Sequence, residues 1–381
     1  MSLRSLYMSP KSRKWLLLGL LAFIIAFLLY RYHASHNANQ FSGAKLWDSI
    51  RSANYLYLFL AVVTIYGCYA VRALRWKKFQ AHVGRAHFWN IYAMNLAGFS
   101  ALFLLGRAAE PVRPLLISRK DKVPLADTFG IYALERILDA SCTAVLAAVG
   151  LLLSTSLHSD SAGAFAKGAR TAGTAFAAFA FLAISALVYL RLHGSAILER
   201  RMESWLTEHE HSWRGKVART LLGFSRGVQT VRTWGDLFAA VFLSAIHWLL
   251  VVVCYYLVIK AFSGPISALT FTDSILVLVI TLVGSAAQLP GVGGGSQALS
   301  IFAFTQLYGV GKETAFAAAM VLWAITFAAC SIAGVPILLK EGFSFGQLRQ
   351  MREQEDKEID AEIIAHPSDA TGATRATEPD I

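Results

Sequence analysis

The chain contains few charged residues and few of the motifs that hold metals, nucleotides or disulfides. Only 15% of its 381 residues are charged, whereas 56% are hydrophobic. The four cysteines lie in apolar stretches and form no CxxC pair, so neither a disulfide framework nor a zinc site is expected. There is no HExxH motif, no Gly-Lys-Ser/Thr phosphate loop and no recognisable Ser/His/Asp arrangement. We therefore expect no cofactor and no metal.

Long apolar runs dominate what the sequence does contain. Six runs hold about 16 to 27 mostly apolar residues each, and roughly 20 helical residues cross the hydrocarbon core of a bilayer. These runs are Trp15–Tyr30, Asn54–Val71, Phe129–Thr155, Thr171–Leu190, Leu237–Ile259 and Glu313–Leu339. The first follows basic residues, as a secretory signal does, but it is longer than a usual signal core, and we interpret it as a retained anchor. The fold class predicted is an all-α integral membrane protein with about six full transmembrane helices.

The distribution of basic residues predicts how a further apolar stretch, Phe88–Leu105, lies. If it crossed the membrane fully, the basic loops Arg107–Asp127 and Arg191–Asp236 would both face outside, against the positive-inside tendency. If it enters and returns on one side, both loops are cytoplasmic. We therefore predict a re-entrant hairpin, in a multi-pass protein of the cytoplasmic membrane with both termini in the cytoplasm. The net charge of +11 indicates this topology and contact with anionic lipids, and it does not indicate nucleic acid.

A second broken region is predicted nearer the C-terminus. Phe271–Leu289 is about one membrane thickness long, and it is followed by Pro290 and a glycine-rich break. The next apolar piece, Ser296–Tyr308, is too short to span. This pattern favours another broken or re-entrant pair, entering from the outside. Two hairpins from opposite faces would resemble transporters, in which broken helices meet near the midplane.

The domain organisation follows from these segments. We expect a cytoplasmic N-terminus at residues 1–14, a transmembrane domain at 15–340 and a cytoplasmic tail at 341–381. The region from Lys340 to Ile381 holds five basic and ten acidic residues, and its polar composition predicts a largely disordered tail.

The first group of candidate site residues lies after the first predicted hairpin helix. Arg107, Glu110 and Arg113 follow one another at spacings of three, so a helical turn would place them on one face. Two guanidiniums at the tip of a hairpin can bind a phosphate through forked hydrogen bonds, with Glu110 holding one of them in place. A surface loop with ordinary positive-inside charge is an equal alternative.

The second group lies near the start of a span. Glu135 and Asp139 are one helical turn apart, with Arg136 between them. Ionisable groups in a membrane helix usually face a cavity or a partner charge, and we expect these carboxylates to pair with Arg107 or Arg113. An ion-pair network that only fixes helix packing is the alternative. The interleaved arginines favour neutralised pairs over a catalytic acid.

The third group is the glycine break, with Gly293, Gly294, Gly295, Ser296 and Gln297. Consecutive glycines permit backbone conformations that other residues cannot reach. A helix beginning near Ser296 would present its positive dipole end and its backbone amides to an anionic headgroup. Close helix packing at the glycines is the alternative. His247, the one histidine within a span, is expected to form an interhelical hydrogen bond in preference to binding a metal.

These three groups, in this order, resemble the flippase-like membrane domain of the lysylphosphatidylglycerol synthase/flippase family. That family shows an Arg-x-x-Glu-x-x-Arg-Pro stretch, then Glu-Arg-x-x-Asp at the head of a helix, then a Pro- and Gly-rich break. The matching residues here are Arg107, Glu110, Arg113 and Pro114, then Glu135, Arg136 and Asp139, then Pro290 to Gly295. The resemblance covers roughly Trp15 to Leu339.

The resemblance implies a protein that moves a lipid or lipid-linked headgroup across the membrane and is not an enzyme. The implied partner is an anionic lipid or lipid-linked substrate, bound by the three groups, with lipid-biosynthesis enzymes or further copies of the chain as other partners. One departure is Gln297, where family members often carry a glutamate, and it casts doubt on proton or cation coupling at that position. A membrane-embedded enzyme or subunit of lipid or glycolipid biosynthesis, and a scaffold for such a complex, are the alternatives.

Overall fold

The computed structural model describes residues 41–106, 109–153, 168, 171–182, 185, 233–289 and 291–342. Several predicted features lie outside the described residues: the span Trp15–Tyr30, part of Thr171–Leu190, most of Arg191–Asp236, Arg107, Pro290, and the tail from residue 343 onward.

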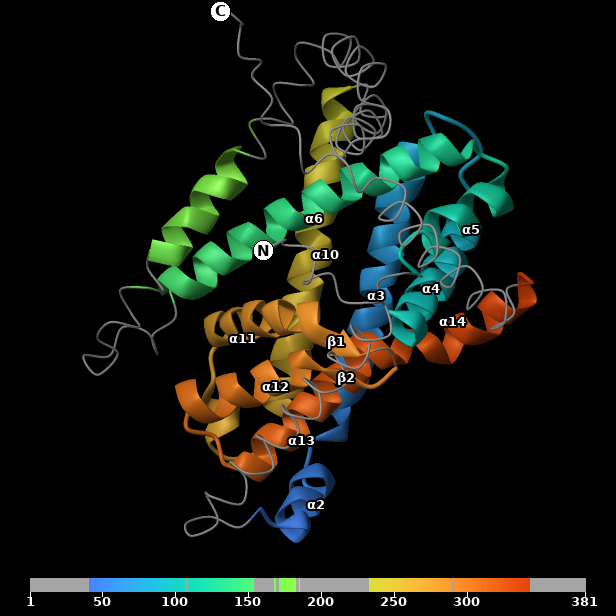
Figure 1. Ribbon diagram of the computed structural model, residues 1–381. Helices are drawn as coiled ribbons and strands as arrows, with labels where there is room; N and C mark the ends of the chain where they lie inside the picture. The colour runs from blue at the N-terminus through green and yellow to red at the C-terminus, as the bar shows by residue number, and fades with distance from the viewer. Residues whose placement is uncertain are drawn as a thin grey trace, which may run out of the picture.

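The described chain is almost entirely helical (Figure 1). The helices are α2 (Gly43–Arg51), α3 (Tyr55–Gln80), α4 (Phe88–Leu105), α5 (Val112–Asp121), α6 (Leu125–Leu153), α10 (Trp234–Ala261), α11 (Phe271–Gly284), α12 (Gly295–Phe302), α13 (Lys312–Trp323) and α14 (Ala329–Lys340). Short 3-10 turns are η5 (Pro265–Ala268) and η6 (Ser285–Ala287), and π-helical segments are η7 (Ala303–Leu307) and η8 (Ala324–Ala328). The described strands are β1 (Gln288–Leu289) and β2 (Gly293–Gly294), which pair antiparallel.

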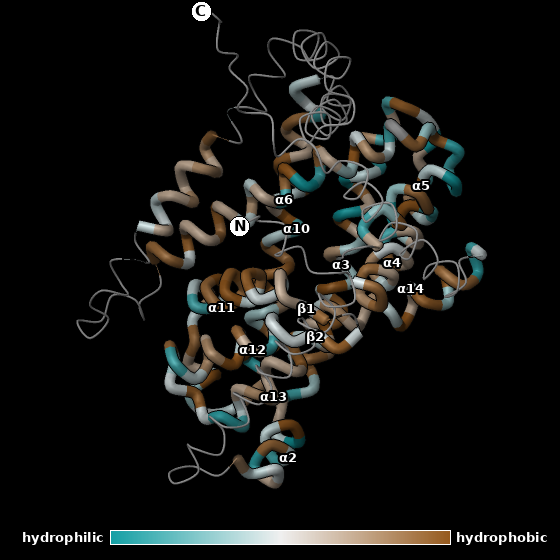
Figure 2. The backbone as a smooth tube through the Cα atoms, viewed as in Figure 1, coloured by the Kyte–Doolittle hydropathy of each residue, from teal (hydrophilic) through white to brown (hydrophobic). Residues whose placement is uncertain are grey.

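Five described helical stretches are long and apolar enough to cross a bilayer. They are α3, α4, most of α6, α10, and the continuous stretch Lys312–Lys340 that joins α13, η8 and α14. Hydrophobic residues run along these elements in Figure 2. The prediction of an all-α membrane protein is confirmed.

An antiparallel pair, α3 and α10, forms the axis of the molecule. At one end the Asn54 amide donates to the Ala261 carbonyl at 2.7 Å. At the other end Lys78 lies 3.7 Å from the Asp236 carboxylate. Because α4 follows the C-terminal end of α3 and α11 follows the C-terminal end of α10, the two predicted hairpins start at opposite ends of this pair.

The first hairpin consists of α4 and α5. Asp121, at the end of α5, accepts a hydrogen bond from Asn90 at 2.8 Å near the start of α4, so the chain returns to where it entered. Between the two legs Gly98 leaves room for α5, because a Cβ at Gly98 would lie 2.5 Å from the Arg113 Cβ. The predicted pairing of two helices as a hairpin is confirmed, and its return to the same side of the membrane stays a prediction.

The second hairpin consists of α11 and α12, with the β1–β2 turn at its tip. Its legs pack so closely that a Cβ at Gly295 would lie 2.2 Å from the Gly284 carbonyl oxygen. Tyr308, beyond α12, donates to the Asp273 backbone carbonyl at 3.4 Å near the start of α11. The predicted broken pair is therefore confirmed as well, and its entry from the outside stays a prediction.

The tips of the two hairpins meet. The Gly291 amide donates to the Phe103 carbonyl at the end of α4, at 2.7 Å. Figure 1 shows the teal α4–α5 hairpin and the orange α11–α12 hairpin approaching each other across α3. Non-helical backbone at membrane depth is tolerated where it is buried in protein or lines a cavity, and this contact satisfies one such amide.

We predict that Gly98→Ala lowers the free energy of unfolding by about 1–3 kcal/mol, the usual cost of overpacking a tight contact. Gly67→Ala on α3 is the matched control, because nothing lies within 4 Å of a Cβ there. Alanine forms helix better than glycine, so the control is expected to be neutral or slightly stabilising. Unfolding curves of both variants in detergent test this, and equal stability would contradict the close contact of α4 with α5.

Candidate functional site

Two arginines on α3 face two carboxylates on α6. Arg72 and Arg75 are three residues apart and Glu135 and Asp139 are four apart, so each pair shares one helix face. Arg72 Nη1 lies 2.9 Å and Arg75 Nη2 lies 2.8 Å from Glu135 Oε1. Arg75 Nη1 also lies 2.9 Å from Asp139 Oδ1. These ion pairs join α3 to α6 inside the bundle.

Arg113 brings the first hairpin into this cluster. It lies at the start of α5 and is 3% exposed. Its Nη2 donates to Glu135 Oε2 at 2.5 Å, and its guanidinium stacks over the rings of Trp76, Phe99 and Tyr132 at 4.9 to 5.2 Å. A planar, weakly hydrated guanidinium suits such an apolar, stacked position.

Arg136 and Glu110 complete the charged set. Arg136 Nη2 lies 3.2 Å from Asp139 Oδ2, and its side chain is 41% exposed. Its guanidinium lies 5.1 Å from the centre of the Tyr132 ring, which Arg113 also contacts. The Tyr132 hydroxyl donates to Glu110 Oε2 at 2.9 Å. In the described part of the chain four guanidiniums therefore surround Glu135 and Asp139, and they still outnumber the carboxylates when Glu110 is included.

Helix α10 contributes neutral hydrogen-bond acceptors to the cluster. Arg75 Nη1 donates to the Ser244 hydroxyl at 2.7 Å, and Arg72 Nη2 lies 2.8 Å from His247 Nε2. Because a guanidinium can only donate, His247 Nε2 accepts, and the proton of the neutral ring is on Nδ1. Nδ1 accordingly donates to the Cys68 carbonyl at 3.2 Å. The predicted interhelical hydrogen bond of His247 is confirmed.

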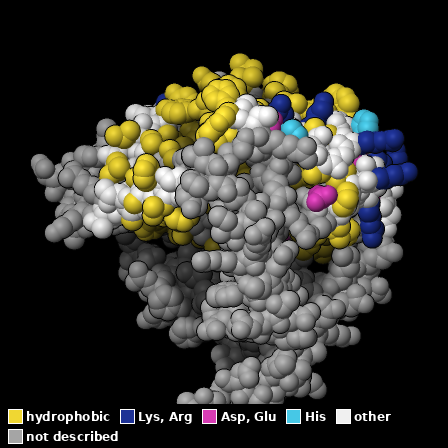
Figure 3. Space-filling view, turned by 90° about the horizontal axis from the view of Figure 1, so that it is seen from above, with side chains coloured by type: hydrophobic (Ala, Val, Ile, Leu, Met, Phe, Trp, Pro, Cys, Tyr) yellow, Lys and Arg dark blue, Asp and Glu magenta, His cyan; other side chains and the backbone are white. Residues whose placement is uncertain are grey.

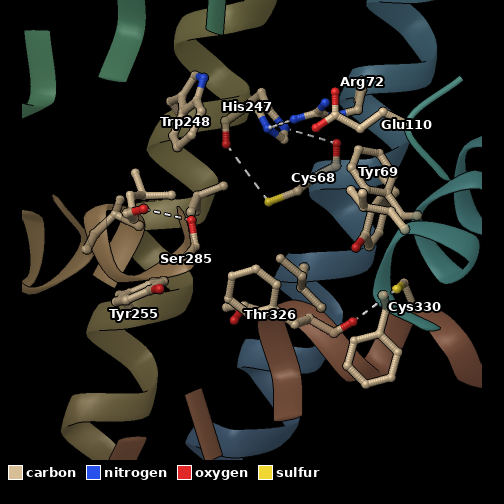
Figure 4. Close-up of a pocket in the computed structure, with 18 of the residues that line it drawn as sticks. Cys68, Tyr69, Arg72, Glu110, His247, Trp248, Tyr255, Ser285, Thr326 and Cys330 are labelled. Atoms are coloured by element: carbon tan, nitrogen blue, oxygen red, sulfur yellow. Dashed lines mark hydrogen bonds between the residues drawn. The ribbon is translucent and has the colours of Figure 1, made fainter. Parts of the chain in front are cut away.

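A cavity of about 430 Å³ lies beside this cluster, between α3, α4, α10, α11 and the α13–α14 stretch. Arg72 of α3, His247 of α10 and Glu110 of the hairpin turn lie together at its polar end (Figure 4). Arg136 of α6, whose ring partner Tyr132 donates to Glu110, also lines the cavity. The rest of the wall is mainly apolar and aromatic. It includes Ile65, Tyr69, Phe99, Leu102, Phe103, Trp248, Val251, Tyr255, Leu278, Leu282, Leu289 and Phe327.

The polar end of the cavity holds donors that have no acceptor. The Nε atoms of Arg72 and Arg136 are buried and have no hydrogen-bond partner among the described residues. A buried donor without a partner is costly, and a buried excess of positive charge is more so. A second cavity of about 20 Å³ adjoins the first, and Glu110, Arg113, Tyr132 and Arg136 are among its lining residues. The arrangement can bind an anion at one end and an apolar or aromatic-contacting group along the rest.

The glycine break has a different position from the charged cluster. Gly293 and Gly294 have φ angles of 91° and 127°, which residues with a Cβ atom rarely adopt. Gln297 Oε1 accepts from the Gly294 amide at 2.5 Å, and its Nε2 donates to the Val292 carbonyl at 3.1 Å. The buried Ser296 hydroxyl donates to the same Oε1 at 3.2 Å. A glutamate could accept but not donate here, so the glutamine is suited to closing this turn.

None of the five described residues from Gly293 to Gln297 lines the larger cavity, although Ser285, Ala286 and Leu289 of the same hairpin do. Gly295 is used for close packing against Gly284. A substrate-binding role for the five residues stays a prediction.

The charged residues predicted from sequence partly meet as expected. The pairing of Glu135 with Arg113 is confirmed. Asp139 pairs instead with Arg72, Arg75 and Arg136, because it lies one helical turn beyond Glu135 and faces α3. Glu110 accepts from Tyr132, and Arg107 lies outside the described residues.

Sequence reasoning missed Arg72 and Arg75. The predicted span ended at Val71, whereas α3 continues to Gln80 and buries both arginines. The available signal was two arginines three residues apart directly after an apolar run, since charges within a membrane helix usually have a function or a partner.

Comparison with known proteins gives one family. The family described as the lysylphosphatidylglycerol synthase TM region matches residues 15–334. A UPF0104 membrane protein of Methanothermobacter thermautotrophicus is 24% identical over 323 residues, which cover 79% of this chain and 90% of that relative. No solved structure matches.

We predict that Glu135→Gln destabilises the protein by about 3–5 kcal/mol, the usual cost of breaking a buried ion pair, because three guanidiniums lose their shared carboxylate. Glu341→Gln makes the same change in the more exposed ion pair with Lys120 and is expected to cost less than about 1 kcal/mol. Denaturation in mixed micelles compares them. Equal effects would show that the cluster does not hold α3, α5 and α6 together.

Proposed function

We propose that this chain, which belongs to the lysylphosphatidylglycerol synthase transmembrane-region family, moves lipids with an anionic headgroup across the membrane. The chain is a multi-pass membrane protein, with five described helical stretches long enough to span a bilayer. The supporting observation is the cavity between the two hairpins, which has unpartnered arginine donors at one end and apolar walls elsewhere.

In this proposal the headgroup phosphate binds Arg72 and Arg136. Both line the cavity, both have a buried Nε without a partner, and a guanidinium binds phosphate through two parallel hydrogen bonds. Arg75 and Arg113 do not line the larger cavity, and their role is to hold Glu135 and Asp139 so that the cavity keeps its positive charge.

The apolar part of the wall receives the start of the lipid tails, while the remainder of each tail stays in the bilayer. Pockets that bind amphiphiles are mostly apolar with a few placed polar groups, as here. The meeting of the two hairpin tips at the cavity supports a transporter, because broken helices that meet near the midplane are typical of that class.

We propose that the protein transports the lipid and does not catalyse a reaction on it. A catalytic acid among Glu135 and Asp139 would need to hold a proton, whereas each carboxylate lies within 3.4 Å of at least two guanidiniums. Such neighbours favour the ionised form, which suits orienting the arginines and not donating protons.

The site proposal predicts that Arg136→Gln lowers transport of fluorescent phosphatidylglycerol in proteoliposomes by about tenfold or more, since a hydrogen bond to a charged group contributes about 1.5–3 kcal/mol. Arg85→Gln, the same change at an exposed position outside the cavity, is the control and should transport normally. Quenching of outer-leaflet fluorescence with dithionite measures the rate. Equal rates for Arg136→Gln and the wild type would remove Arg136 from the site.

We also propose that the protein lies in the cytoplasmic membrane with both termini in the cytoplasm. Basic side chains gather on one side of the face seen in Figure 3, which views the molecule from the end where α5 lies in Figure 1. At the end of α5, Arg119, Lys120 and Lys122 are exposed, and Lys120 lies 2.6 Å from Glu341, which follows α14. The positive-inside tendency favours a cytoplasmic location for that end.

The topology proposal predicts that Asp48→Cys, on α2, reacts with a membrane-impermeant maleimide in intact cells, whereas Lys120→Cys reacts only after the cells are opened. The native cysteines Cys68, Cys254 and Cys330 are buried and Cys142 is half-buried, so they should add little labelling. The reverse pattern would invert the topology.

A further inference from the structure

We propose that His247 takes up a proton when an anionic headgroup binds Arg72, so that headgroup and proton occupy the cavity together. The inference rests on the proposed function, because it takes the occupant to be an anionic headgroup. It begins from the position of His247, which lines the cavity and also contacts Arg72 (Figure 4).

Without a headgroup, the hydrogen bonds around His247 require the neutral ring. Nε2 accepts from Arg72 Nη2 at 2.8 Å, and Nδ1 donates to the Cys68 carbonyl at 3.2 Å. A proton on Nε2 would place two donors against each other, next to a guanidinium charge. The ring therefore has one basic atom, and Arg72 occupies it.

A bound phosphate competes for that same arginine. Arg72 Nη1 donates to Glu135, Nη2 contacts His247, and Nε has no partner among the described residues. A forked phosphate contact on the free side of the guanidinium uses Nε together with the adjacent Nη2. The headgroup therefore draws Nη2 away from His247 and frees the lone pair of Nε2.

The charges around His247 oppose a protonated ring until an anion is added, because two arginines and one carboxylate face it. The charged groups facing His247 are Arg72 and Arg75 from α3 and Asp139 from α6, with Glu110 and Arg136 at the same end of the cavity. The residues that line the cavity from α11, η6 and the α13–α14 stretch include Leu278, Leu282, Ser285, Thr326 and Cys330, none of which carries a fixed charge.

In this environment the phosphate adds one negative charge beside the ring. A proton supplied by the buffered bulk solution then binds Nε2, which donates to the phosphate oxygen in place of accepting from Arg72. The added charges of phosphate and imidazolium cancel. By linkage, a step that takes up one proton strengthens headgroup binding by up to about tenfold for each unit that the pH falls.

Calorimetry on the full chain in lipid nanodiscs tests the proposal. Dihexanoyl phosphatidylglycerol and dihexanoyl phosphatidylserine, whose phosphodiesters do not titrate near neutrality, are titrated in two buffers of different ionisation enthalpy at one pH near neutrality. The difference in heat gives the number of protons taken up, which we expect to be close to one for the wild type. His247→Gln keeps an acceptor for Arg72 but cannot take up a proton, and it should bind with uptake near zero.

His87→Gln is the matched control. His87 is an exposed histidine at the base of the first hairpin, 3.7 Å from Asp121, and it does not line the cavity. This variant should keep the uptake of the wild type. Nitrogen-15 NMR of histidine-labelled wild type gives a second readout that needs no variant: the His247 signals should change from the neutral Nδ1–H form to imidazolium when the lipid is added.

The outcomes separate the two proposals. Wild-type binding without proton uptake, unchanged uptake in His247→Gln, or a ring that stays neutral with lipid bound would each overturn the role of His247 and leave the anion site standing. If neither lipid binds the wild type, the proposed anionic headgroup site itself is wrong, and the proton coupling falls with it.

Discussion

The sharing of Glu135 among three guanidiniums is the interaction on which the rest of the structure depends. One carboxylate oxygen contacts Arg72 and Arg75 of α3, and the other contacts Arg113 of α5. Each of these charges would be costly alone inside a membrane protein, so each fixes the others. The same contacts join two spanning helices to a hairpin and form the positive end of a cavity, which means that stability and the proposed binding site come from one cluster.

The second constraint is that irregular backbone at membrane depth must be satisfied by protein. Both hairpins break near the middle of the molecule, and the Gly291 amide of one uses the Phe103 carbonyl of the other. Gln297 closes the glycine turn with one side chain that accepts and donates. The cavity lies where these breaks meet, because Phe103 and Leu289 both line it.

Much of the architecture was predictable because membrane proteins are limited to a few solutions. The positions of Arg107–Asp127 and of other basic loops predicted the first hairpin, and the short segment Ser296–Tyr308 predicted the second. The pairing of Glu135 with Arg113 was also predicted. Arg72, Arg75 and His247 were not assigned to the site, because the apolar run was taken to end at Val71 and a span boundary cannot be placed more closely than a helical turn or so by hydropathy.

The sequence by itself determined that the protein lies in a membrane, that it is helical, where its helices break and which residues carry charge into the bilayer. These features follow from segment length, hydropathy and glycine placement, which act locally along the chain. The tertiary structure alone decided which charges meet. Asp139 faces α3 and not Arg113, and His247 reaches Arg72 from a helix 175 residues away. Such contacts depend on how the packed helices are rotated and how they cross. That packing is set by side-chain volume, as at Gly98 and Gly295, where the lack of a side chain permits close contact.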